Sequence, residues 1–160
     1  MRTLLHPASK SPALTDLALL VSRVALGVIL LAHGWQKLNE YTVAGTAASF
    51  AQMGVPAPTA AATFATAVEL VGGAALILGL FTPLFALLNV ANLIGAFALV
   101  HAGNGVFVEN GGYELVLALA AGLVVIAVLG GGKLSVDGLI GRRYTARPTA
   151  ATTPTAAATA

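Results

Sequence analysis

Five ionisable residues stand within or beside long apolar stretches, where charge is costly. They are Arg23, His33, Lys37, Glu69 and Glu114. A charged side chain in a membrane-spanning helix costs roughly 2.5–3.5 kcal/mol on insertion scales, so such residues usually face the bundle interior and have partners there. Arg23 and Glu69 are expected at similar depths, and each is followed by glycines that permit close helix approach. We therefore predict a buried Arg23–Glu69 pair. The pair could either fix the register of the two helices or take part in the protein's function.

The remaining three residues suggest a ligand site near the other membrane face. His33, Lys37 and Glu114 are expected at one depth, and Lys37 and Glu114 have opposite charges. They form a candidate ligand pocket, in which an apolar slot with a polar end would suit a small ligand. The alternative for His33 is an ordinary core or interfacial histidine. No pattern identifies a catalytic residue.

Two asparagines and a histidine occupy the third apolar stretch. Asn89 and Asn92 are three residues apart on one helix face, a spacing that favours interhelical polar contacts over ligand binding. His101, at the end of the stretch, is interpreted as structural. A bis-histidine haem would need His33 and His101 in one cavity, and an α-helical wheel places His101 opposite Asn92. Haem is therefore disfavoured, and the residues alone leave the cofactor unknown.

Composition places the chain among membrane proteins. Of its 160 residues, 58% are hydrophobic and 9% charged, and the mean hydropathy is +0.89. Soluble domains are about 45–50% apolar and about 25% charged. The chain has no cysteine, which excludes disulfides, a C-x-x-C redox pair and thiolate-bound iron–sulfur clusters, and with only three histidines no metal site is predicted. The net charge of +2, without a basic stripe, argues against nucleic acid as a partner.

Four apolar segments approach the length of about 20 residues that spans a bilayer: 16–38, 59–81, 83–101 and 113–130. They predict an all-α integral membrane four-helix bundle, because a lone segment in lipid must satisfy its own backbone groups. Residues 42–53 are too short to span and suggest an interfacial or re-entrant helix. We divide the chain into an N-terminal flank (1–13), the transmembrane domain (14–141) and an Ala/Thr/Pro tail (142–160) that we expect to be disordered.

The basic residues predict the orientation. Loops kept on the cytoplasmic side carry an excess of Lys and Arg. The flanks of the first and last segments contain Arg2, Lys10, Lys133, Arg142, Arg143 and Arg147. The loop after the third segment has no Lys or Arg. Both termini are therefore predicted to be cytoplasmic. A signal peptide cleaved near "AHG" (32–34) is the less favoured alternative, since the flank is long and cleavage would discard Arg23.

Several local patterns occur in a recognisable order. They are "RVALGVILLAHGWQKL", "FAQMGVPAP", "ELVGGAALILGLFTPL" and "GGYELVLALAAGLVVIAVLGGGKLSVDGLI". This set resembles the DoxX family of small four-helix bacterial membrane proteins, over about residues 14–141. One departure is Gly131, where the family is expected to have proline. This difference affects only the end of the helix predicted over 113–130.

The resemblance implies a multi-pass protein of the bacterial inner membrane. It also implies a subunit or anchor of a quinone-linked oxidoreductase, or of an oxidative-stress defence complex with soluble redox enzymes as partners. Whether such a subunit is itself catalytic stays open, and so does a homo-oligomer. Two alternatives come from the residues themselves: a small-molecule carrier or channel built on the buried Arg–Glu pair, and a membrane scaffold without a ligand.

Overall fold

A computed structural model of the chain describes residues 11–145. Most of the predicted N-terminal flank (1–10) and most of the tail (146–160) lie outside these residues. Within the described range the protein is all-α, as predicted, with six α-helices. They are α2 (Pro12–Trp35), α3 (Thr42–Gln52), α4 (Pro58–Leu78), α5 (Thr82–Ala96), α6 (Glu114–Leu129) and α7 (Val136–Thr145).

Three continuous helical stretches are long and apolar enough to cross a membrane: Pro12–Glu40, Pro58–Leu78 and Thr82–Asn104. The fourth predicted segment is also a helix, α6, but its 16 residues are fewer than the about 20 that a span perpendicular to the bilayer needs. Large apolar side chains are exposed on the outside of the bundle, including Val128 at 78% and Phe81 at 62%. An apolar exterior of this kind fits a lipid environment.

Two of the long stretches change from α-helical to π-helical winding near one end. Turn η2 (Gln36–Glu40) extends α2, and turn η3 (Phe97–His101) extends α5. The π form uses i→i+5 hydrogen bonds, so it rotates the following side chains away from the positions of a regular α-helix. Both turns lie at the end of the bundle that also contains α3.

Helices α2 and α4 pack so closely that glycine is required where they cross. A Cβ on Gly27 would lie 2.7 Å from the backbone oxygen of Gly73, and a Cβ on Gly73 would lie 2.7 Å from the backbone nitrogen of Leu31. A Cβ on Gly34 would similarly lie 2.7 Å from the backbone nitrogen of Leu70. These contacts fix the antiparallel register of the two helices, with Gly27 opposite Gly73.

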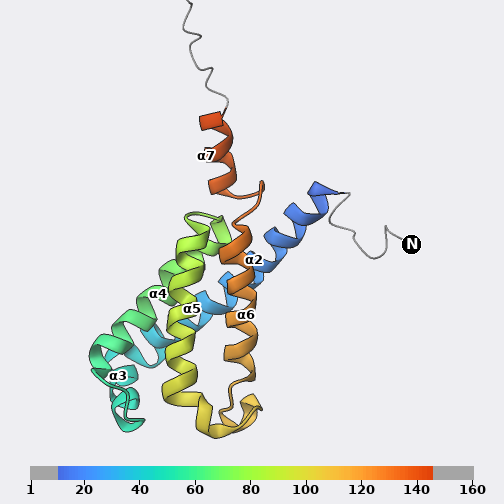
Figure 1. The fold of residues 1–160 in the computed structure, drawn as a ribbon. Helices are drawn as coiled ribbons and strands as arrows, with labels where there is room; N and C mark the ends of the chain where they lie inside the picture. The colour runs from blue at the N-terminus through green and yellow to red at the C-terminus, as the bar shows by residue number, and fades with distance from the viewer. Residues whose placement is uncertain (1–10, 146–160) are drawn as a thin grey trace, which may run out of the picture.

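Helices α5 and α6 run side by side as a hairpin, and α2 crosses the bundle obliquely (Figure 1). The hairpin loop is closed by backbone hydrogen bonds from Tyr113 to Gly105 (3.1 Å) and from Glu114 to Val106 (2.9 Å). The buried core is aliphatic and draws on α2, α4, α5 and α6, with Leu30, Leu76, Ala86, Leu123 and Ile126 almost fully buried.

The "KLSVDG" segment (133–138) provides caps for two different helices. Ser135 caps α7, since its Oγ accepts from the backbone N–H of Gly138 at 3.0 Å. The Asp137 carboxylate instead caps α5, accepting from the backbone N–H groups of Phe81 and Thr82, each at 2.8 Å. A carboxylate at a helix N-terminus satisfies otherwise unpaired N–H groups and complements the helix dipole. Asp137 therefore joins the C-terminal segment to the α4–α5 turn.

Candidate functional site

Arg23 is almost fully buried, at 2% exposure, but it does not pair with Glu69. Its guanidinium donates to the backbone carbonyl oxygens of Leu76 (2.9 Å), Ile77 and Leu134. Leu76 and Ile77 belong to the last turn of α4, where carbonyls have no partner within the helix and the dipole favours a cation. The arginine therefore caps α4 and ties it to the segment between α6 and α7.

The predicted Arg23–Glu69 pair is thus corrected by the register of α2 and α4. Arg23 lies opposite Leu76 and Ile77, which are seven and eight residues beyond Glu69 along α4. At 1.5 Å per residue this is about 10–12 Å, or two helical turns. The Gly27–Gly73 contact sets this register, and aligning the two apolar segments by their ends could not reveal it.

The partner of Glu69 is Lys37. Lys37 Nζ lies 2.6 Å from Glu69 Oε2, and the side chains are 19% and 8% exposed. Asn92 Nδ2 donates to the other carboxylate oxygen, Oε1, at 3.1 Å. Three elements, η2, α4 and α5, therefore meet at one carboxylate whose two oxygens are both bonded.

This trio borders a cavity of about 430 Å³ between α2, α3, α4, α5 and α6. Most of the lining is apolar, including Leu30, Phe50, Phe64, Ala65, Val116 and Leu119. The polar side chains that line it are His33, Lys37, Glu69, Asn92 and His101. The volume falls in the range of about 300–1,000 Å³ that is typical of small-molecule sites, and a few polar groups in an apolar wall are their usual chemistry.

The two histidines present similar groups to this cavity. His33 Nδ1 is 2.9 Å from the carbonyl oxygen of Ile29, and His101 Nδ1 is 2.7 Å from that of Gly111. A carbonyl can only accept, so each Nδ1 carries the proton and each Nε2 is left as an acceptor in the neutral ring. The wheel argument that separated His101 from Asn92 was wrong, because turn η3 changes the winding between them.

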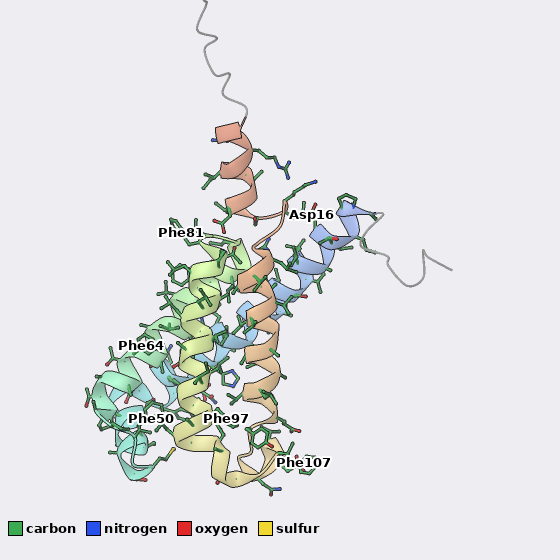
Figure 2. All side chains as sticks on the ribbon, in the orientation of Figure 1. Asp16, Phe50, Phe64, Phe81, Phe97 and Phe107 are labelled. Atoms are coloured by element: carbon green, nitrogen blue, oxygen red, sulfur yellow. The ribbon has the colours of Figure 1, made fainter. Side chains whose placement is uncertain are left out.

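The cavity opens toward the apolar exterior of the bundle. Among its lining residues, Met53, Phe64 and Leu99 are about half exposed. Phe50 on α3 and Phe64 on α4 lie on the same side of the bundle (Figure 2). A ligand that entered here would therefore leave its apolar part against lipid while a polar part reached His33 and Glu69.

Glu114 does not line this cavity and does not pair with Lys37. Its Oε1 accepts from the backbone N–H of Val108 at 2.9 Å, which closes the α5–α6 loop. Of the three residues predicted for the pocket, His33 and Lys37 line the cavity and Glu114 does not. The other polar residues that line it are Glu69, Asn92 and His101. Asn89 is fully buried and links two helices, since its Nδ2 donates to the carbonyl oxygens of Val68 (3.3 Å) and Phe85 (2.9 Å).

Sequence alone could have indicated the Lys37–Glu69 pair only through the helix register. Both residues stand out in the sequence as buried-charge candidates, but their expected depths pair Glu69 with Arg23 and Lys37 with Glu114. Asn92 and His101 carried no distinguishing signal, since an asparagine in a membrane helix usually bonds a neighbouring helix. No group of three or more His, Cys, Asp or Glu residues that could hold a metal occurs in residues 11–145.

These features define a class: a helical membrane protein whose interior contains a buried ion pair beside an apolar cavity. Known sequences identify the family. The DoxX family profile matches residues 18–102, a little over half of the chain, and the protein belongs to the DoxX family.

Two curated relatives come from Escherichia coli (strain K12). Inner membrane protein YqjF is 29% identical over 132 residues, covering 82% of this chain and 98% of the relative. Inner membrane protein YphA is 27% identical over 124 residues, covering 74% and 87%. No solved structure matches the chain significantly. The predicted family and inner-membrane location are confirmed.

Proposed function

We propose that this DoxX-family protein is a membrane subunit or anchor of a quinone-linked oxidoreductase or oxidative-stress defence complex. In this proposal its interior cavity holds the quinone headgroup. The observation that carries the proposal is the convergence of His33, His101 and the Lys37–Glu69 pair on one apolar cavity of about 430 Å³.

The chemistry of the lining suits both oxidation states of a quinone. The two carbonyl oxygens of a quinone accept hydrogen bonds, which the Lys37 ammonium and the Asn92 amide can donate with the hydrogens left after binding Glu69. The hydroxyl groups of a quinol donate, and the Nε2 atoms of His33 and His101 can accept. The apolar, laterally open wall suits a hydrocarbon tail that stays in the membrane.

We further propose four spans with both termini cytoplasmic, which places the cavity near the outer leaflet. Helix α6 can complete a fourth crossing together with the polar loop at its start and the glycine-rich link at its end. Soluble enzymes would then meet the opposite face, formed by α7 and the α4–α5 turn. A carrier function receives less support, because the buried Arg23 caps a helix and contacts no cavity-lining carboxylate.

Quinone binding can be followed through Trp35, the single tryptophan, which is 58% exposed and does not line the cavity but is only two residues from His33 along the chain. A short-tailed benzoquinone titrated into the detergent-purified protein should quench this fluorescence with saturation. His33→Ala and Asn92→Leu should weaken binding at least tenfold while the helical content stays unchanged. Ala67→Leu, an exposed position on α4 outside the cavity, is the matched control and should bind like the unmodified protein. Linear, unsaturable quenching that is the same in all variants would contradict the proposal.

Native purification tests the assignment to a complex. The protein should be isolated from membranes in mild detergent, and the extract examined for quinone and for soluble redox enzymes. Retained quinone without any protein partner would support the cavity and contradict the anchor role. An enzyme retained without quinone would support the anchor role alone.

A further inference from the structure

A second hollow lies near the other end of α2, between its N-terminal half and the C-terminal half of α6. Its volume is about 470 Å³, and its lining is almost wholly apolar, including Leu14, Ala18, Leu19, Ser22, Val125 and Leu129. None of these residues lines the cavity described above. The hollow exists because α2 crosses obliquely and its N-terminal part extends away from the other helices (Figure 1).

One end of this groove is closed by the link between α6 and α7. Asp16 lies near this link (Figure 2). Its Oδ1 accepts from the backbone N–H of Lys133 at 2.9 Å, and a Cβ on Gly132 would lie 3.3 Å from both Asp16 and Leu19. Arg142 Nη2 donates to the carbonyl oxygen of Lys133 at 2.8 Å. The groove therefore ends at a polar cluster formed by Asp16, Lys133 and Arg142.

The charge at this end is net positive. The Lys133 side chain is 63% exposed, and its Nζ is 4.0 Å from Asp16 Oδ2, at the limit of an ion pair. Arg142 and Arg143 follow on exposed positions of α7. Lys133, Arg142 and Arg143 carry three positive charges here, against two negative charges on Asp16 and Asp137, so this end of the groove is net positive.

We propose that this groove binds an anionic phospholipid of the leaflet that adjoins α7. One acyl chain lies between α2 and α6, and the phosphate lies against Lys133 and the basic residues of α7. An acyl chain is the apolar partner that a bilayer always supplies, and basic residues just outside a membrane helix attract anionic headgroups. The site is separate from the proposed quinone cavity, since it lies near the opposite end of α2 and shares no lining residue with that cavity.

Native mass spectrometry of the full chain can test the site. The protein in mild detergent is given phosphatidylglycerol and phosphatidylcholine with identical acyl chains. The anionic lipid should be retained preferentially, and Lys133→Gln should reduce this preference roughly fivefold, the effect of one basic residue near an anionic surface. Ala18→Leu should fill the groove and reduce retention of both lipids. Ala67→Leu, remote from the groove, should leave retention unchanged.

Equal retention of both lipids by the unmodified protein would overturn the proposal, and so would undiminished retention in Ala18→Leu. If Ala18→Leu fails to fold, Ser22→Leu fills the same groove from the next turn of α2 and should likewise reduce the retention of both lipids. A lipid-free dimer that Ala18→Leu converts to monomer would assign the groove to a second copy of the chain and also overturn the proposal.

Discussion

Neutralising one member of the Lys37–Glu69 pair should destabilise the protein far more than neutralising both. The two charged atoms are 2.6 Å apart, and neither side chain is more than about one-fifth exposed. Removing one partner of a buried pair leaves an uncompensated charge, which typically costs about 3–5 kcal/mol. Glu69→Gln also weakens the acceptor of Asn92, so it should be at least as costly as Lys37→Gln.

The double variant Lys37→Gln/Glu69→Gln leaves no lone charge and should recover a large part of the loss. We expect a coupling energy above about 1.5 kcal/mol, within the range of close charge pairs. The assay is the free energy of unfolding in mixed micelles, followed by far-ultraviolet circular dichroism for the two single variants and the double variant.

The matched control is the cycle that combines Arg23→Gln with Glu69→Gln. Arg23 contacts carbonyl groups about two helical turns from Glu69, so these two losses should add to within about 0.5 kcal/mol. Additive losses for Lys37 and Glu69, together with strong coupling for Arg23 and Glu69, would refute the register of α2 and α4 described here.

Three further predictions follow from other contacts. Gly73→Val should abolish the α2–α4 crossing and with it the folded protein, measured as monodisperse yield on size exclusion, whereas Gly95→Val has no neighbour within 4 Å and should be tolerated. Asp137→Ala removes the cap of α5 and should lower the free energy of unfolding by about 0.5–2 kcal/mol, while Asp137→Asn, which can still accept, should lose less. Reporter fusions after residues 41, 82, 107 and 145 should be read as outside, inside, outside and inside; an inside signal at 41 or 107 would reverse the orientation.

The helices were predictable because hydrophobic runs and turn residues are local signals. The segment predicted at 59–81 is α4 (Pro58–Leu78), and the one at 113–130 is α6 (Glu114–Leu129). The short helix expected over 42–53 is α3 (Thr42–Gln52). The glycines that permit the close crossing were also visible, although the residues they contact were not.

The partners of the buried charges were not predictable, because they depend on helix register and winding. A shift of about two helical turns between α2 and α4 decides whether Arg23 contacts the Glu69 carboxylate or the carbonyl groups at the end of α4. The π-helical turn η3 decides whether His101 reaches the cavity, and no residue in "FALVH" marks that turn. Glu114 was lost from the predicted pocket because a loop N–H competes for its carboxylate.

The central claim is that a quinone headgroup occupies the cavity between His33, His101 and the Lys37–Glu69 pair. Photo-crosslinking with an azido-quinone, followed by peptide mass spectrometry, tests it most directly. We expect adducts on the peptides that carry His33 and His101, and these adducts should be competed by unmodified quinone and lost in His33→Ala. Adducts confined to the groove between α2 and α6, or adducts that unmodified quinone does not displace, would contradict it.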